Sequence, residues 1–240
     1  LSTSIAPRMI VDALLKKTTI SFSECMIQVF SSHVFGCLEI FILILTAVDR
    51  YVDICKPLHY MTIISQWVCG VLMAVAWVGS CVHSLVQIFL ALSLPFCGPN
   101  VINHFYCDLP QLFQLSCSST QLNELLLFAV GFIMAGTPMA LIVISYIHVA
   151  AAVLRIRSVE GRKKAFSTCG SHLTVVAIFY GSGIFNYMRL GSTKLSDKDK
   201  AVGIFNTVIN PMLNPIIYSF RNPDVQSAIW RMLTGRRSLA

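Results

Sequence analysis

The chain alternates between long apolar segments and short polar ones. Uncharged or nearly uncharged segments extend over residues 26–48, 67–94, 125–154, 165–188 and 201–220. Each could form a helix that crosses a hydrocarbon core of about 30 Å, which takes about 20 residues. A shorter apolar piece, residues 5–15, is expected to be the outer part of one more helix. The pattern therefore predicts an all-α membrane protein.

The segment at residues 25–60 is the centre of the predicted bundle. Cys25, Glu39 and Arg50 fall on one stripe of a continuous helix, and the sequence Asp49-Arg50-Tyr51 follows the apolar residues directly. Twenty-five residues at about 1.5 Å each place Arg50 about 37 Å from Cys25. One helix is thus expected to link a cysteine near one membrane surface to an arginine near the other.

Composition and charge support this prediction and orient the chain. Of 240 residues, 55% are hydrophobic and only 12% are charged, which is too little charge for the surface of a soluble domain. The net charge of +7 gathers in residues 155–164 and after the last apolar segment, so no nucleic-acid partner is predicted. Lys and Arg concentrate on the cytoplasmic side of a bilayer. Residues 155–164 and the C-terminus are therefore expected in the cytoplasm.

The nine cysteines divide into two groups. Four are expected on the outer, oxidising side, where disulfides form, but four cysteines allow three pairings and the sequence alone does not choose among them. The others are expected to be small buried side chains. The spacing Cys169-x-x-His172 offers too few ligands for a metal centre, so no metal and no cofactor is predicted. The outer four are Cys25, Cys97, Cys107 and Cys117, and the others are Cys37, Cys55, Cys69, Cys81 and Cys169.

The C-terminal part combines a bend with a surface helix. Asn210, Pro211, Asn214 and Pro215 lie within the last apolar segment, where each proline frees backbone carbonyls. Residues 222–234 then show apolar positions at helical spacing between arginines, with Asn222 as the expected N-cap and Pro223 at the first helical position. They are expected to form an amphipathic helix on the inner membrane surface. The N-terminal Leu1 and the short first segment suggest a fragment of a longer protein.

Several motifs resemble the signatures of olfactory receptors, within the rhodopsin-like G-protein-coupled receptors. The resemblance implies one receptor domain over residues 1–240, a seven-transmembrane helix bundle that lacks its first helix and the start of its second. It also implies that Cys25 pairs with Cys107 and Cys97 with Cys117. Asp53 and Val48 depart from the residues that are usual in the family. The motifs are Thr46 to Tyr60, Ser145-Tyr146, Lys164 to Leu173, and Pro211 to Asn222.

The resemblance further implies olfactory sensory transduction at the plasma membrane. A small volatile odorant would bind in the outer half of the bundle, and a heterotrimeric G protein of the stimulatory olfactory type would act as transducer at the inner face. Arg50 would pair with Asp49 at rest and meet Tyr146 and Tyr218 in the active state. Alternatively, the Arg50 side chain extends to the lipid headgroups and has no role as a switch. The implied coupling and switch residues are Asp49, Arg50, Tyr51, Tyr146, His172, Asn214, Pro215 and Tyr218.

The outer-half stripes suggest a mostly apolar ligand lining with few hydrogen-bonding groups. Each of its members is explained equally well by helix packing. Glu39 and Asn210 are expected as interior polar residues, either in structural packing with Asn214 or linked to a cation. The lining set is Ser32, His33, Gly36, Cys37, Val130, Met134, Tyr180, Ile184, Tyr187, Ile204 and Thr207.

Three other functions compete with the receptor. A membrane transporter would show internal repeats with matching interrupted helices, and the sequence has none. An enzyme would need a catalytic motif, and no metal-binding His-Glu-x-x-His, Gly-x-Ser-x-Gly or phosphate-binding loop occurs, so no enzyme is predicted. A truncated, non-signalling receptor product is the remaining alternative.

Overall fold

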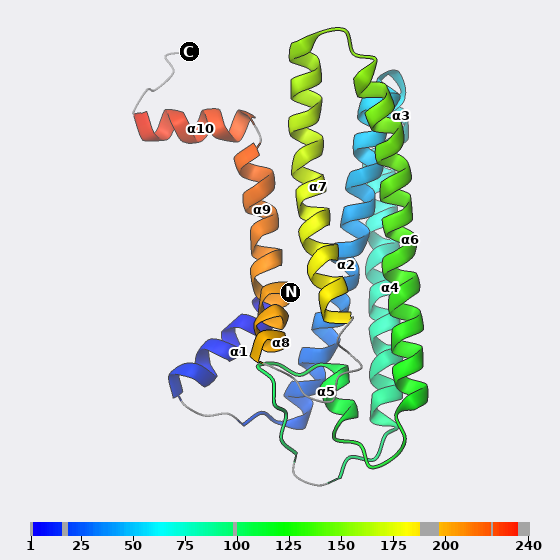
Figure 1. The fold of residues 1–240 in the computed structure, drawn as a ribbon, viewed down its shortest axis with the longest axis vertical. Coiled ribbons are helices and arrows are strands. Elements are labelled where there is room, and N and C mark those ends of the chain that lie inside the picture. Colours follow the sequence, from blue (N-terminus) through cyan, green and yellow to red (C-terminus); the bar gives the residue numbers. More distant parts are fainter. Residues whose placement is uncertain (1, 16–18, 98–99, 188–196, 222, 235–240) are drawn as a thin grey trace.

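The structure is a computed structural model that describes residues 2–15, 19–97, 100–187, 197–221 and 223–234, and it is helical over most of them (Figure 1). The element η1 is a 3-10 helix and η2 is a π-helix. The order is α1 (Ser2–Leu15), α2 (Phe22–Cys55), η1 (Pro57–His59), α3 (Tyr60–Ile63), α4 (Gln66–Leu92), α5 (Leu109–Phe113), α6 (Gln121–Leu154), α7 (Val159–Tyr187), α8 (Asp197–Ile204), η2 (Phe205–Ile209), α9 (Asn210–Arg221) and α10 (Pro223–Thr234).

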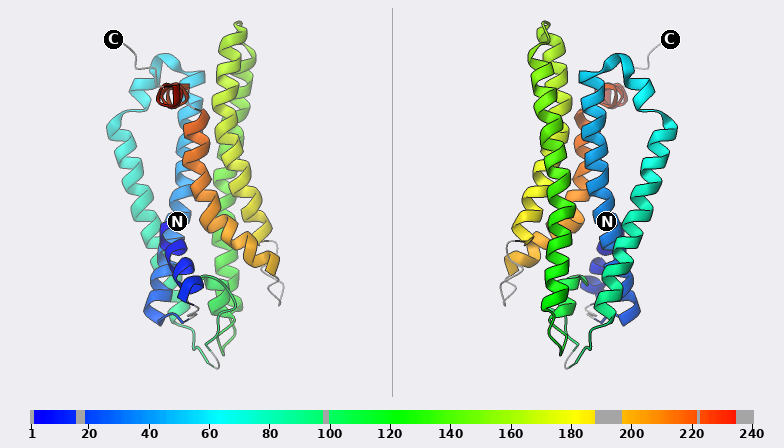
Figure 2. Two further views of the ribbon diagram at one scale, coloured as in Figure 1. Left: turned by 90° about the vertical axis from the view of Figure 1, so that its left-hand side faces the viewer. Right: turned by 90° about the vertical axis from the view of Figure 1, so that its right-hand side faces the viewer.

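Helix α2 is the central element of the bundle. It contacts α4, α6 and α7, and α4 lies on one side of it with α6 and α7 on the other (Figure 2). Among the described residues, α2, α4 and α6 are long and apolar enough to cross a membrane. The predicted segments 165–188 and 201–220 correspond to α7 and to the succession of α8, η2 and α9 beside it. Helix α10 turns away from the end of α9 (Figure 1).

The start of α2 is set by a capping box at Ser21. The Ser21 hydroxyl accepts the backbone N–H of Glu24 at 3.2 Å, and the Glu24 carboxylate accepts the Ser21 N–H at 3.0 Å. This exchange satisfies two backbone donors that a helix start would leave unpaired. The helix then continues for 34 residues to Cys55, two residues before Pro57, which cannot continue it.

The buried core forms four clusters along α2, one of which joins Val34 and Leu38 to Ala76 of α4. At the outer end it surrounds Cys25, Val29 and Cys107. In the middle it joins Leu43 and Ala47 to residues of α6 and α7, which are Ile142, Val175, Val176 and Tyr180. At the inner end Val149, Val153 and Cys169 form a smaller cluster. The bundle is therefore packed from one end to the other around a single helix.

Three connections and the burial of some cysteines differ from the sequence-based expectation. The loop at residues 155–164 ends early, because α7 begins at Val159 and the Ser158 hydroxyl accepts the Gly161 N–H at 3.0 Å. The connection after α2 contains η1 and α3, and the long outer loop contains α5. Of the five cysteines expected to be buried, only two are, since Cys55 and Cys81 are half-buried and Cys69 is exposed on α4. The N-cap predicted at Asn222 lies outside the described residues.

Candidate functional site

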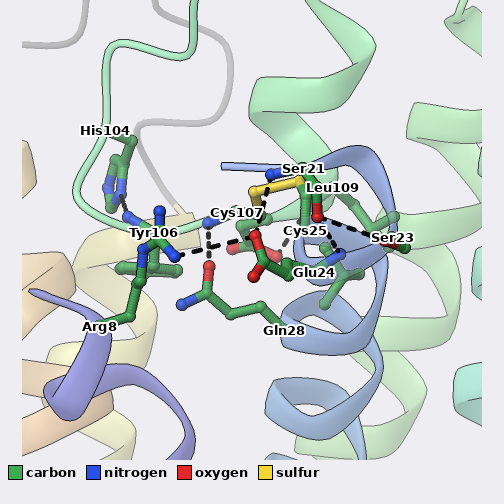
Figure 3. Close-up of a disulfide and its surroundings, with 12 residues drawn as sticks. Arg8, Ser21, Ser23, Glu24, Cys25, Gln28, His104, Tyr106, Cys107 and Leu109 are labelled. Atoms are coloured by element: carbon green, nitrogen blue, oxygen red, sulfur yellow. Dashed lines mark hydrogen bonds and ion pairs between the residues drawn. A yellow bond between two sulfur atoms is a disulfide. The ribbon is translucent and has the colours of Figure 1, made fainter. Parts of the chain in front are cut away.

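The outer end of α2 carries a loop that is fastened to it twice (Figure 3). Cys25 forms a disulfide with Cys107, with a Cα–Cα distance of 5.4 Å. One helical turn further, the buried Gln28 side chain accepts the backbone N–H of Cys107 at 2.8 Å. A second disulfide joins Cys97 to Cys117 within the loop. These are the two pairs that the resemblance implies, and they hold the loop across the outer end of the bundle.

The same loop also reaches the last helical segment. The Tyr106 side chain hydrogen-bonds with Thr207 in η2, and its ring meets that of His104 edge-on, with centroids 4.3 Å apart. A Cβ atom on Gly203 would come within 3.2 Å of both side chains, so a larger residue there would make them shift by a few tenths of an ångström. Burial raises the pKa of Tyr106 and lowers the pKa of His104, because it disfavours the charged form of each.

The predicted ligand-lining residues come from α2, α6, α7, α8 and η2. Cys37 and Tyr180 are buried, whereas Ile184 is 53% exposed. The Tyr180 hydroxyl has no hydrogen-bond partner among the described residues. The side chain of Tyr187 lies outside the described part. The other members are half-buried: Ser32, His33, Gly36, Val130, Met134, Ile204 and Thr207.

Four buried side-chain oxygens lie in α2 and in the segment formed by η2 and α9. Glu39 Oε2, Asn206 Oδ1, Asn210 Oδ1 and Asn214 Oδ1 are shielded from solvent and have no hydrogen-bond partner within the described ranges. Asn206 donates from its other atom to the Ser182 carbonyl at 3.0 Å, which links η2 to α7. The expected packing of Glu39 with Asn210 and Asn214 stays a prediction.

At the inner end of α2, the Arg50 side chain lies between two carboxylates. It pairs with Asp49, and its Nη1 lies 3.6 Å from Asp53 Oδ2. The hydroxyl of Tyr60, in α3, donates to Asp49 Oδ1 at 2.7 Å. This hydrogen bond raises the pKa of Tyr60, because the carboxylate holds the phenol proton. The arginine charge is therefore compensated by two carboxylates of its own helix, and Tyr60 holds one of them.

A second polar connection joins three helices above this ion pair. The Tyr146 hydroxyl in α6 lies 2.8 Å from Nδ1 of His172 in α7, and Nε2 of His172 lies 3.1 Å from the Leu43 carbonyl in α2. The two rings are stacked, and His172 is 1% exposed. The resemblance implies that Tyr146 meets Arg50 in the active state. In this structure its hydroxyl hydrogen-bonds with His172.

The remaining predicted switch residues occupy separate positions. The Tyr51 ring meets His148 of α6 edge-on, with centroids 6.0 Å apart. Asn214 is half-buried in α9, Pro215 is exposed there, and the side chain of Tyr218 lies outside the described part.

Sequence reasoning assigned no role to Gln28, Tyr106 or Tyr60. Gln28 was missed because it follows Cys25 by only one helical turn and looks like an ordinary helix residue. Tyr60 stands within one of the motifs on which the resemblance rests, and its position eleven residues after Asp49 could have drawn attention to it.

The helix bundle and its disulfide-fastened outer loop define a multi-pass membrane protein with the fold of rhodopsin. Squid rhodopsin aligns with a TM-score of 0.64 over 93% of this chain and 64% of its own chain, at 20% identity. That likeness concerns the fold alone.

The chain belongs to the olfactory receptor family, whose family model matches residues 1–236. Olfactory receptor 3A1 of Homo sapiens is 74% identical over 98% of this chain and 74% of its own length. Olfactory receptor 3A2 of Pan troglodytes is 64% identical over 99% of this chain and 75% of its own length. The chain thus spans about three quarters of these relatives.

Proposed function

We propose that this chain senses a small volatile odorant in the outer half of its bundle and activates a heterotrimeric G protein at its inner face. The observation that carries the proposal is the connection from Tyr146 through His172 to the Leu43 carbonyl. It ties α6, α7 and α2 together at a buried point between the two ends. Hydrogen bonds of this kind can stabilise one arrangement of the helices and break when the helices move to another.

The ligand would lie beneath the disulfide-fastened loop. Tyr180 contributes a buried hydroxyl without a partner among the described residues, and the Thr207 hydroxyl hydrogen-bonds with Tyr106 of the loop. A mostly apolar surface with a few such groups suits a small molecule of modest polarity. Because the loop contacts α2 and η2 together, a ligand that displaces either one also shifts the other.

The G protein would bind where Arg50 is held. The loop after α2 exposes two large apolar side chains there, Leu58 at 93% and Met61 at 81%. Exposed apolar side chains beside a half-buried charge are typical of a surface that binds another protein. In this proposal α6 and α7 move away from α2, and Tyr146 leaves His172 to meet Arg50. The sequence Asn214-Pro215 supplies the bend in α9, and Tyr218 is a further partner.

The proposed transducer is the stimulatory olfactory type, so activation raises cyclic AMP. The receptor lies in the plasma membrane with residues 155–164 and the C-terminus in the cytoplasm. Arg157 and Lys163 are exposed at that end, as the excess of positive charge on the cytoplasmic side requires.

The test is a cyclic AMP assay in cells that express the receptor containing this chain, challenged with a panel of odorants. At least one odorant should raise cyclic AMP, and Arg50→Ala should abolish the response while surface expression remains. Arg231→Ala removes an exposed arginine of α10 and serves as the control, with an unchanged response. A full response from Arg50→Ala would contradict the proposal.

A further inference from the structure

The outer loop meets the last helical segment through a pair of rings. The rings of His104 and Tyr106 are nearly perpendicular, with centroids 4.3 Å apart. Both lie against Gly203 of α8, where an added Cβ atom would come within 3.2 Å of them. Tyr106 also hydrogen-bonds with Thr207 of η2. His104 is therefore part of the interface between the loop and the last helical segment.

The hydrogen bond that His104 makes in this interface requires its neutral form. The backbone N–H of Tyr106 donates to Nδ1 of His104 at 3.4 Å (Figure 3). A backbone N–H can only donate, so Nδ1 carries a lone pair and the ring proton is on Nε2. A second proton would bind Nδ1 and face the Tyr106 N–H. Protonation of His104 therefore breaks this hydrogen bond.

Two charged groups near His104 have opposite effects on its protonation. Burial is the main cause that lowers the pKa of His104, Asp108 raises this pKa, and Lys200 lowers it further. Lys200 of α8 is held close by its hydrogen bond to the side chain of Asn103, at 2.8 Å. A proton on His104 would thus add a positive charge beside an existing one.

The other titratable groups around the interface keep their charge in mildly acidic medium. Burial raises the pKa of Tyr106, which therefore stays neutral. Arg8 of α1, drawn nearby in Figure 3, pairs with the carboxylates of Asp12 and Glu24. The side chains of residues 197–199 lie outside the described part. Among the described groups, the histidine is the one that changes charge between about pH 7 and pH 5.

We propose that extracellular protons release the outer loop from the last helical segment by protonating His104, and that this release weakens the response to odorant. The proposal rests on the proposed function, since the ligand would lie beneath this loop. Protonation places two positive charges together and removes the acceptor of the Tyr106 N–H. The loop then loses its contact with Thr207, while the disulfide to Cys25 keeps it on α2. His104 is a positioning residue that acts through the loop.

The size and the pH range of the effect follow from these contacts. Because the pKa of His104 is lowered, the contact is complete above the ordinary histidine value of about 6.5 and is lost as the pH falls below it. One hydrogen bond is lost on protonation. Acidifying the medium from pH 7 to pH 5 should therefore raise the half-maximal concentration of an uncharged odorant by about threefold to tenfold.

Three variants test the role of the charge. His104→Gln keeps an acceptor oxygen but binds no proton, so its half-maximal concentration should be equal at pH 7 and pH 5. Lys200→Gln removes the opposing charge and should move the midpoint of the acid effect to higher pH. Asp108→Asn removes the supporting charge, keeps a residue type that caps helix α5, and should move the midpoint to lower pH. A structural role alone would not move the midpoint in opposite directions.

Two readouts are needed on the receptor that contains this chain. The first is odorant-induced cyclic AMP, normalised to surface expression and to direct stimulation of adenylyl cyclase at the same pH. The second is hydrogen–deuterium exchange of the Tyr106 amide in the purified receptor, corrected for the pH dependence of exchange from free amides. Release of the loop exposes this amide and speeds its exchange. The second readout needs neither odorant nor G protein.

Val101→Ala is the control for a change in the same loop. Val101 is 71% exposed, so the variant should keep the acid effect of the unmodified receptor. A loss of the acid effect in Val101→Ala as complete as in His104→Gln would overturn the assignment of His104. If His104→Gln does not reach the surface, the opposite midpoint shifts of Lys200→Gln and Asp108→Asn carry the test, and shifts in one direction would overturn the proposal.

The outcomes separate the release of the loop from the proposed function. Faster Tyr106 exchange at pH 5 together with a weaker odorant response, both absent in His104→Gln, supports both. Faster exchange with no odorant response from any variant at pH 7 supports the release and contradicts the proposed function. An equal acid effect on exchange in His104→Gln and in the unmodified receptor overturns the proposal, and so does a half-maximal concentration that acid leaves unchanged.

Discussion

Replacing His172 by phenylalanine is the sharpest perturbation of the inner half of the bundle. The side chain is 1% exposed and its two ring nitrogens lie within hydrogen-bond distance of Tyr146 and the Leu43 carbonyl. His172→Phe keeps a planar ring of similar size, which can still stack on Tyr146. The substitution therefore removes the two hydrogen bonds while largely preserving the packing.

The magnitude follows from the number of hydrogen bonds lost. A buried hydrogen bond contributes about 1 kcal/mol net, so His172→Phe should cost the observed arrangement about 2 kcal/mol. That corresponds to a change of about 30-fold in the ratio of open to closed receptor. Tyr146→Phe removes the bond to His172 in the closed arrangement, about 1 kcal/mol, and the proposed contact with Arg50 in the open one, so it should change the ratio little. The double variant should have lower basal activity than His172→Phe alone, because the two changes share one closed-state bond and the double variant also lacks the open-state contact of Tyr146 with Arg50.

The assay is basal cyclic AMP per receptor at the cell surface, measured for the single and double variants together. Leu173→Phe is the matched control, since it places a phenylalanine at the exposed neighbouring position of α7. It should leave basal activity unchanged. Wild-type basal activity in His172→Phe at normal surface expression would refute the reasoning, and so would additive effects in the double variant.

Three further predictions concern the outer end. Cys107→Ser should abolish delivery of the receptor to the cell surface, because it frees the loop from α2. Cys117→Ser leaves the Cys25–Cys107 disulfide intact and should lower delivery less. Flow cytometry of surface receptor compares the two variants, and equal losses would contradict this ranking. Gln28→Leu leaves the Cys107 N–H buried without its acceptor and should lower the free energy of unfolding by about 1–3 kcal/mol. The purified Gln28→Leu receptor should therefore unfold at a lower thermal midpoint than Gln28→Glu, which keeps an acceptor oxygen. Equal midpoints would contradict this prediction. Burial lowers the pKa of His104, so its stabilising contribution is present above the ordinary histidine pKa and is lost as pH falls below it. Acidifying the medium from pH 7 to pH 5 should therefore lower the thermal midpoint, and His104→Gln should lessen that fall; an equal fall in both would count against this.

The long helices follow from the apolar pattern, but their ends do not. The pattern located residues 26–48, whereas α2 extends from Phe22 to Cys55. The extra turns are stabilised by the capping box at Ser21 and by the pairing of Arg50 with Asp53. Both are interactions of polar side chains, so the pattern of apolar residues does not predict them.

The inner site was foreseen as a set of residues but not as a set of contacts. Tyr146 and His172 each belong to a recognisable motif, yet their hydrogen bond depends on how α6 and α7 rotate toward one another. Tyr60 reaches Asp49 only because η1 and α3 turn the chain back. Contacts of this kind depend on the relative placement of elements, which no spacing along the chain encodes.

The most direct test of the account is a structure of the receptor containing this chain, bound to the nucleotide-free stimulatory olfactory G protein. The account predicts that Arg50 has left Asp49, that Tyr146 has left His172 for Arg50, and that Leu58 contacts the G protein. A complex in which Arg50 still pairs with Asp49 and Tyr146 still bonds His172 would contradict the central claim.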